Sequence, residues 1–581
     1  MSHTLEHKWD LSSLFKSEKD IQDYIPKLKK RAKDYEKKYL NTLESLKATE
    51  FQSAITEYES IIEGISGVMT YAFLVFATDT KRGDFYAKYE LLANEIEESI
   101  VFFEIEFCQL EEKKQKEFIK YSQKYAHYLQ GLLDKKAHQL TLAEEKILLN
   151  TSPVGVGAFS RLFDEHLASL KIRYEDKVLN EEEILALLHH NDRDIRKKAQ
   201  KCFSKELQKS SFLLTYILNM VRKDLGIQTK LRSYDKKESF RHIDNQITQK
   251  SVDSMIDTVN ANFSFVHRYY RVKSKILDLT LRDYDRYAPI MSDGENIQYE
   301  EAVQSVLKAF KNFSPKFYEI AKNALKNGWV DSHPKDGKRG GAFSHGCIPS
   351  AHPYVLLNFT GNRRDAFTIA HEFGHMIHQE LSKKVGYLNM DTPLTTAETA
   401  SVFAEMLLFD DLKNSLCADE LFGIYAGKIE DIFSTLFRQV VMTNFERRIH
   451  DIEGELKDKD FDKIWREENE KMFDTSLKLT KNYDRWWSYI PHFIHSPFYC
   501  YSYSYGQLLV LALFGLYKSG KNKDFVNIYI DFLSRGGSES PKELVARFGF
   551  DIESKDFWKI GIGEIKKMLE EFERIYNERI K

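Results

Sequence analysis

A pentapeptide of the pattern H-E-x-x-H, at residues 371–375, has the residue types and spacing for metal chemistry. On a helix, His371 and His375 would lie on one face, so both imidazoles can bind a single Zn²⁺. Glu372 can reach a water held by that metal, which is the general-base arrangement of metalloproteases. The pattern therefore predicts zinc-dependent hydrolysis of peptide bonds.

A well-formed helix is expected to carry this pentapeptide. Asn362 is a suitable N-cap with an acid, Asp365, three positions on, apolar residues follow at helical spacing, and Gly386 marks the end. Gly374 costs about 1 kcal/mol in a helix interior. Its presence predicts a close approach by another backbone or by a substrate.

A third metal ligand is expected downstream, because catalytic zinc takes three protein ligands and keeps one position for water. Glu398 lies at the start of a second helical pattern that begins near Thr395. The alternative is that Glu398 closes a capping box with Thr395. Beside the pentapeptide, metal ligation is favoured.

Other polar residues near these patterns have open roles. Glu405 lies two helical turns after Glu398 and could orient a ligand histidine as its hydrogen-bond acceptor, or be a solvated helix residue. Three more histidines flank the pattern and are expected to be ordinary polar groups: His345, His352 and His378.

A histidine- and tyrosine-rich run covers residues 491–506. Its phenol and imidazole groups suit the stabilisation of an oxyanion, although aromatic runs more often serve packing. The hydroxyl-rich composition favours a wall that lines a polar cavity.

Strand signals are sparse and fall between about residues 281 and 359. Residues 284–290 and 354–359 read as short strands. Between them, the glycine-rich stretch 337–346 is either a surface loop or an edge strand beside the metal that pairs with a bound peptide.

Composition places these features in a mainly helical protein. The chain has 581 residues, only 11 prolines, and amphipathic helical patterns from about residue 17 to 187, with breaks near 79–83 and 151–157. The polar stretch 192–198 suggests a boundary between an N-terminal helical lobe, 1–195, and a catalytic domain, 196–581.

Charge and cysteine content exclude several classes of function. A net charge of −3 gives no general attraction to nucleic acid. Five scattered cysteines without a C-x-x-C pair argue for a reducing compartment and against a cysteine zinc site. Residues 1–14 lack a signal-peptide pattern, and the longest apolar run, 508–517, is too short for a membrane span. We expect a soluble, cytoplasmic protein with no nucleic-acid or membrane partner; the oligomeric state is left open.

These motifs together resemble the M3 (thimet oligopeptidase-like) family of zinc metallopeptidases, in its oligoendopeptidase F branch. The resemblance rests on residues 370–375, on 398–401 with Glu405, and on the Tyr-Asp-Arg-Tyr-Ala-Pro segment 284–289. The stretches 337–344, 491–506 and 9–15 extend it over nearly the whole chain.

The resemblance implies a fold and roles for individual residues. The fold is a two-lobed helical clamshell with a deep channel and a small β element beside the zinc. The implied ligands of one zinc ion are His371, His375 and Glu398, with Glu372 as general base. His492 and some of the four tyrosines at 499, 501, 503 and 505 would contact substrate or the oxyanion, and His492, Tyr499 and Tyr503 are favoured.

The sequence thus predicts a zinc-dependent oligoendopeptidase that cleaves internal bonds of short unfolded peptides. A zinc carboxypeptidase-like exopeptidase is the nearest alternative. A non-catalytic helical peptide-binding protein is the alternative from another class, and the intact Glu372 and both histidines argue against it.

Overall fold

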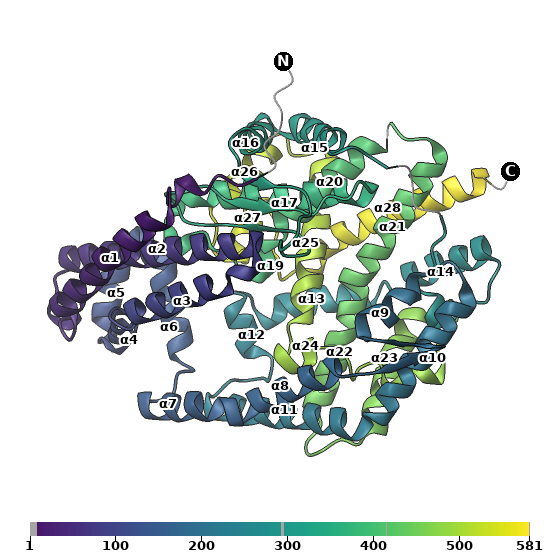
Figure 1. Cartoon of the computed structure of the whole chain (residues 1–581), viewed down its shortest axis with the longest axis horizontal. Helices are drawn as coiled ribbons and strands as arrows, with labels where there is room; N and C mark the ends of the chain where they lie inside the picture. The colour runs from purple at the N-terminus through teal and green to yellow at the C-terminus, as the bar shows by residue number, and fades with distance from the viewer. Residues whose placement is uncertain (1–7, 292–295, 414, 580–581) are drawn as a thin grey trace. The chain divides into compact units, whose positions relative to one another are not determined.

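The computed structural model of the chain describes residues 8–291, 296–413 and 415–579, and it is mainly helical (Figure 1). The predicted fold class, mainly α with few short strands, is confirmed. Of the N-terminal stretch 1–14, residues 1–7 lie outside the described residues.

The chain forms two compact units, each built from three segments. Unit 1 comprises residues 1–136, 294–415 and 519–549, and unit 2 comprises 137–293, 416–518 and 550–581. The boundary expected near residue 195 does not coincide with a boundary of these units, and the division into 1–195 and 196–581 stays a prediction.

Unit 1 opens with six helices and continues with those that surround the H-E-x-x-H pattern. Their bounds are α1 Glu18–Tyr39, α2 Ala48–Thr78, α3 Gly83–Glu97, α4 Phe102–Gln109, α5 Glu112–Tyr121, α6 Ala126–Lys136, α15 Tyr299–Phe313, α16 Pro315–Lys326, α17 Arg363–Ser382, α18 Tyr387–Met390, α19 Leu394–Ala397, α20 Thr399–Leu412, α26 Phe525–Ser534 and α27 Pro541–Ala546.

Unit 2 holds the remaining helices and a two-stranded hairpin. The helices are α7 Leu142–Thr151, α8 Val156–Ala168, α9 Glu181–Ala186, α10 Arg193–Lys209, α11 Ser211–Leu231, α12 Ser239–Asp244, α13 Gln249–Asn260, α14 Ser264–Leu277, α21 Ala418–Ile432, α22 Arg438–Asp451, α23 Asp458–Phe473, α24 His492–His495, α25 Cys500–Ser519 and α28 Lys555–Arg579. The expected breaks near 79–83 and 151–157 are confirmed by the ends of α2 and α7.

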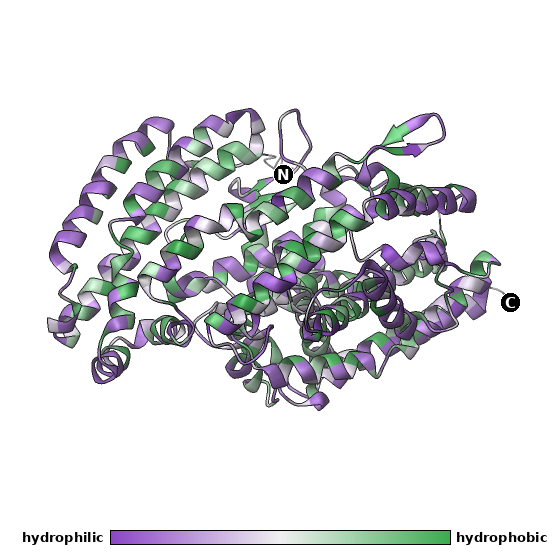
Figure 2. Cartoon of the chain, turned by 90° about the horizontal axis from the view of Figure 1, so that it is seen from below, coloured by the Kyte–Doolittle hydropathy of each residue, from purple (hydrophilic) through white to green (hydrophobic). Residues whose placement is uncertain are grey.

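Helical spacing of apolar residues produces the core of the first segment. On α1, the residues at one face are all buried: Ile21, Ile25, Leu28, Ala32, Tyr35 and Tyr39. Burial of each large apolar side chain contributes about 1.5–3 kcal/mol to stability. Figure 2 shows the same alternation of polar and apolar residues along many helices.

Helix α2 is, among the described helices, the one long and apolar enough to cross a membrane by length and composition. Of its most apolar window, 56% is buried inside the structure. Core helices pass the same test, so this is weak support for a membrane span. Small and polar residues interrupt the apolar positions of α2, so its sequence contains no long continuous apolar run.

A small three-stranded sheet lies in unit 1, in the order β3 (Val330–Asp331), β5 (Tyr354–Leu356), β4 (Phe343–His345). Strand β4 pairs antiparallel with β5 and is an edge strand, as the sharper interpretation of the glycine-rich stretch expected. The other expected strand, 284–290, is wrong: its start is a 3₁₀ turn, η7 (Asp283–Asp285), because Asp285 caps it by accepting the Arg282 backbone N–H.

The two-stranded hairpin of unit 2, β1 (Ile172–Tyr174) with β2 (Lys177–Leu179), was missed by the sequence analysis. Each strand has only three residues. Segments of this length contain too little alternation of polar and apolar residues to predict a strand.

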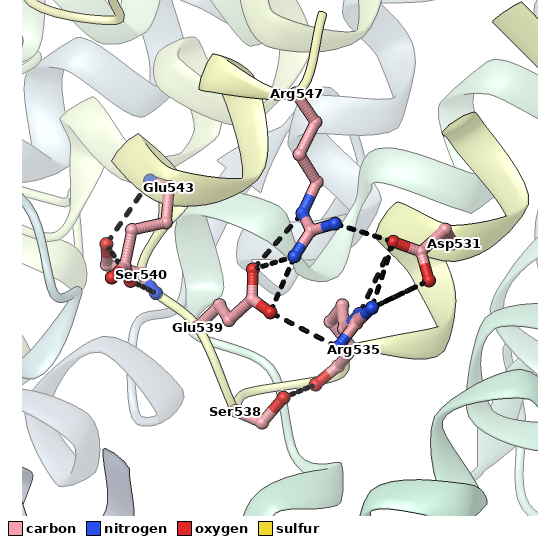
Figure 3. Close-up of polar contacts among 7 residues, drawn as sticks. All are labelled: Asp531, Arg535, Ser538, Glu539, Ser540, Glu543 and Arg547. Carbon is pink, nitrogen blue, oxygen red and sulfur yellow. Dashed lines mark hydrogen bonds and ion pairs between the residues drawn. The ribbon is translucent and has the colours of Figure 1, made fainter.

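A tight turn between α26 and α27 supports the segment that leads to Glu398. Its Gly537 leaves no room for a side chain, since a Cβ there would lie 2.0 Å from the backbone oxygen of Asp391. Two arginines, Arg535 and Arg547, bridge the carboxylates of Asp531 and Glu539 around this turn (Figure 3).

Candidate active site

Helix α17 begins where the sequence predicted and carries the H-E-x-x-H residues near its middle. The Asn362 side chain accepts the Asp365 backbone N–H, and the Asp365 carboxylate accepts the backbone N–H groups of Thr360, Gly361 and Asn362. This capping box fixes the first turn of the helix. The helix ends at Ser382, ahead of Gly386, which has a φ of 87°.

Gly374 is required by the contact between α17 and α20. A Cβ at this position would lie 2.5 Å from the Ala400 carbonyl oxygen and 2.6 Å from the Ser401 Cα. The predicted close approach by another backbone is therefore confirmed. Only glycine allows the two helices to come this close, and their closeness brings the start of α20 to the histidine face of α17.

The side chains of His371, His375 and Glu398 converge at that contact. The Glu398 Oε2 atom lies 3.4 Å from Nε2 of each histidine. Ligands about 2.0–2.2 Å from a tetrahedral zinc are separated by roughly 3.4 Å, so these three atoms fit one zinc ion. The capping-box alternative required Thr395 as an N-cap, but Thr395 lies inside α19, whose N-cap is Pro393.

Two further side chains orient these candidate ligands. The Glu405 Oε1 atom lies 2.6 Å from Nδ1 of His371, and the Ser401 hydroxyl donates to Glu398 Oε2 at 2.7 Å. A carboxylate on Nδ1 leaves Nε2 of His371 for a metal and fixes the ring orientation. This contact favours the interpretation of Glu405 as a residue that orients His371 over its interpretation as a solvated helix residue.

Charges within the cluster shift the ionisation of its members. Burial lowers the pKa of His371, but the carboxylates of Glu405 and Glu398 raise it to about 9 on balance. Burial raises the pKa of Glu398, yet His375 and His371 bring it down to about 2. Burial raises the pKa of Glu372, which is only 7% exposed. The site is thus a set of carboxylates and imidazoles suited to a cation.

The three flanking histidines lie outside this group. His345 is on β4, His352 stacks on Trp329, and His378 is buried, with its pKa lowered to about 3 mainly by that burial. Among the described residues, the group that could hold a metal ion is His371, His375 and Glu398.

The edge strand β4 is attached to the same helix. The Ser344 hydroxyl donates to the Gln379 side-chain oxygen at 2.6 Å, and the Gln379 amide donates to the Ser344 carbonyl at 3.1 Å. Gly346 packs against Gln379, where a Cβ would be 3.3 Å away. The small β element therefore lies beside the helix of the candidate zinc site, as expected.

The predicted substrate-contacting residues lie together in unit 2. Nε2 of His492 is 3.2 Å from the Tyr503 hydroxyl, and the Tyr499 ring is 5.8 Å from the His492 ring and 5.1 Å from that of Tyr503. These three residues form the His492 cluster. Burial, assisted by the charge of Arg438, lowers the pKa of His492, so its imidazole is neutral near pH 7.

The other two tyrosines of the run belong to the core. Tyr501 and Tyr505 are one turn apart on α25 and fully buried. The Tyr501 hydroxyl contacts His242 and Asn245, and the Tyr505 hydroxyl contacts Ser251. The four tyrosines therefore fall into two pairs by helical spacing. Tyr501 and Tyr505 pack in the core, whereas Tyr499 and Tyr503 lie beside His492.

The buried side chain of Glu446 forms a hydrogen bond with the loop between His492 and Tyr499. This residue was not predicted from the sequence. Glu446 accepts the Phe498 backbone N–H at 2.8 Å, where Phe498 has a φ of 58°. This left-handed conformation is unusual for a bulky residue. Burial raises the pKa of Glu446 to about 8. No local pattern could have revealed a partner on another helix.

Comparisons with known proteins agree with this fold and geometry. The profile of peptidase family M3 matches residues 186–564, and that of oligopeptidase F matches 106–172. An oligoendopeptidase F homolog of Borreliella burgdorferi is 31% identical, covering 98% of each chain. Oligopeptidase PepF of Bacillus subtilis is 28% identical, covering 98% of this chain and 87% of that protein.

Solved structures share the fold. A crystal structure from Chlamydophila abortus superimposes with a TM-score of 0.88 at 24% identity, covering 99% of each chain. Oligoendopeptidase-F from Enterococcus faecium gives 0.71 at 20% identity, covering 96% of this chain and 99% of that one. The chain belongs to peptidase family M3. Within the family it belongs to the oligoendopeptidase F branch.

Proposed function

We propose that this chain is a zinc-dependent oligoendopeptidase that cleaves internal bonds of short unfolded peptides in the cytoplasm. Family membership supports peptidase activity, and M3 peptidases are generally zinc enzymes. The observation that carries the finer proposal is the convergence of His371, His375 and Glu398, with Glu372 in the same motif. These residues would hold one zinc ion.

Zinc, when bound, lowers the pKa of water and polarises a carbonyl oxygen. Glu372 would take the proton from the attacking water and pass it to the leaving amine, as a general base and then a general acid. Its burial, which raises the pKa of the carboxyl group, favours this exchange near neutral pH. Glu405 and Ser401 would keep His371 and Glu398 oriented throughout.

The His492 cluster would supply hydrogen bonds to substrate. A neutral imidazole and phenol hydroxyls can donate to a peptide carbonyl whose oxygen gains charge during attack. The edge strand β4 would bind the peptide backbone by adding it to the sheet. Such recognition through main-chain groups suits extended peptides of varied sequence.

The decisive variant is Glu372→Gln, which keeps the size of the side chain and removes the base. We expect it to retain zinc, measured by elemental analysis, and to lose roughly 10²–10⁴-fold in peptide cleavage rate. Glu380→Gln on the same helix is the matched control, because Glu380 pairs with Lys383 and lies outside the ligand set. Full activity of Glu372→Gln would refute the mechanism.

Cleavage position separates the endopeptidase from its alternatives. Mass spectrometry of a mixed library of peptides blocked at both ends, with and without a chelator, should show chelator-sensitive internal cuts. Removal of C-terminal residues from unblocked peptides alone would indicate an exopeptidase. Binding without any cleavage by zinc-loaded protein would indicate a peptide-binding protein.

A further inference from the structure

Two arginines of unit 2, the buried Arg286 and the partly buried Arg438, have no carboxylate partner among the residues that the structure describes. Arg286 is 7% exposed, and its Nη1 donates to the Tyr483 hydroxyl at 3.0 Å. Nη1 of Arg438 donates to the Tyr287 hydroxyl at 2.8 Å. The Nε atoms of both arginines are buried without a hydrogen-bond partner in the described part of the chain.

Two other buried arginines of this unit have carboxylate partners, and a third, Arg222, is bound by carbonyl oxygens, three of them from the backbone. Arg196 is bound by Asp285, and Arg485 by Asp458 and Asp462. A buried charge that lacks such a partner is costly unless something else compensates it. Arg286 and Arg438 differ from these three arginines because tyrosine hydroxyls accept their hydrogen bonds.

The acid that acts on this cluster is already neutralised. Glu430 accepts hydrogen bonds from Lys273 and Tyr269, both at 2.6 Å, while Lys273 also donates to the Arg286 backbone carbonyl. Glu430 is thus paired with Lys273, and neither Arg286 nor Arg438 forms an ion pair with it in the described part of the chain. The cluster keeps an excess of positive charge.

Tyrosine side chains contact both guanidinium groups. The Arg286 guanidinium lies 4.4 Å from the centre of the Tyr287 ring, and the Tyr489 hydroxyl is 3.5 Å from Nη2 of Arg438. A phenol that accepts an arginine N–H keeps its own O–H as a donor. Arg438 and the two tyrosines are only partly buried, so a ligand can approach this side of the cluster.

The position of Arg438 also points to a binding role. It directly follows the π-helical turn η9 (Phe433–Phe437), a distortion that is often found at functional sites. The charge of Arg438 also acts on His492 and helps to lower the pKa of that imidazole.

We propose that Arg438 and Arg286, with the hydroxyls of Tyr287 and Tyr489, bind a carboxylate of the peptide substrate. Guanidinium groups bind carboxylates through short charge-assisted hydrogen bonds, and the phenol O–H groups add donors. The carboxylate comes either from the peptide C-terminus or from an acidic side chain. The identity of the ligand as a peptide rests on the proposed function.

Binding of short polyalanine peptides with an N-terminal dye tests this site without requiring cleavage. Fluorescence anisotropy on the Glu372→Gln protein compares the free acid with the C-terminal amide, and amides with one internal Glu or Gln. We expect about tenfold tighter binding of at least one carboxylate peptide than of its neutral counterpart. Preference for the free acid identifies the C-terminus, and preference for Glu identifies the side chain. Equal binding in both pairs overturns the proposal.

Variants in the same background locate the effect. Arg438→Gln should abolish the preference and Arg438→Lys should reduce it, whereas Arg271→Gln should leave it intact, because Arg271 is exposed and lies 3.9 Å from Asp474. If folded Arg438→Gln still binds the carboxylate peptide more tightly than its neutral counterpart, the proposal is overturned. If that variant does not fold, an unchanged preference for the carboxylate peptide in Arg438→Lys overturns it. A chain that lacks peptidase activity but keeps the preference would refute the proposed function alone.

Discussion

The candidate metal-ligand group of unit 1 and the His492 cluster of unit 2, with its neighbouring arginines, are polar groups that differ in charge. In unit 1, Glu398 lies 3.4 Å from both His371 and His375, and Glu405 contacts His371. In unit 2, Arg286 and Arg438 are bound by phenols. Under the proposed function, the carboxylates and imidazoles of unit 1 would hold a metal, and the donors of unit 2 would bind oxygens of a substrate.

The two sites also differ in how the chain assembles them. A single helix contact brings the unit 1 residues together, and spacing along α17 and α20 sets most of their geometry. The unit 2 site collects side chains from α22, α24, α25 and the segment after η7. Its composition follows from long-range packing, so it was much harder to predict.

The largest expected effect separates the two sites by metal content. Glu398→Gln should lose bound zinc and, with it, more activity than the roughly 100-fold that an outer hydrogen-bond partner typically contributes. His492→Gln should retain zinc and lose about 10²-fold in kcat, as expected for one oxyanion donor. Elemental analysis and steady-state kinetics of both variants provide the measurements.

A different result would change which residues are assigned to the candidate metal site. Zinc loss in His492→Gln would place that residue in the metal site, and full zinc content in Glu398→Gln would remove Glu398 from it. Circular dichroism should show both variants folded.

A smaller effect is expected from the partner of His371. Glu405→Gln removes the carboxylate 2.6 Å from Nδ1, so zinc affinity should fall about 10–100-fold while the ligands remain. Competition with a chromophoric chelator measures this change. Asp411→Asn is the control, since Asp411 on the same helix pairs with Lys308. Unchanged affinity would show that Glu405 does not orient the ligand.

The smallest effect concerns the acid beneath the loop of the His492 cluster. Glu446 is fully buried with its pKa raised to about 8, above roughly 4.3 for an unfolded glutamate. As pH rises between these values, the unfolded chain loses this proton first, so Glu446 lowers the free energy of unfolding by up to about 1.4 kcal/mol per pH unit.

Denaturant unfolding at about pH 6 and about pH 8 tests this linkage. Glu446→Gln keeps the acceptor for the Phe498 N–H and cannot ionise, so its stability should fall less over this interval than that of the parent. The exposed Glu453→Gln should behave like the parent. An identical pH dependence of the Glu446 variant would show that the group is ionised in the folded state.

Much of the candidate metal site could be predicted because its determinants are local. The pentapeptide, the Asn362 cap and the helical spacing of Glu398 and Glu405 depend on neighbours within one or two turns. The expected strand at 284–290 failed because Asp285 satisfies local backbone groups and favours a turn over a ladder.

The sequence by itself determined the helical class, the chemistry of the candidate ligands and the resemblance to the M3 family. Only the tertiary structure decided that Gly374 contacts the Ala400 backbone, that Tyr501 is core while Tyr503 faces His492, and that Arg438 has phenols instead of carboxylates. Spacing fixes which residues share a face, whereas the partner that covers that face depends on segments distant in the chain.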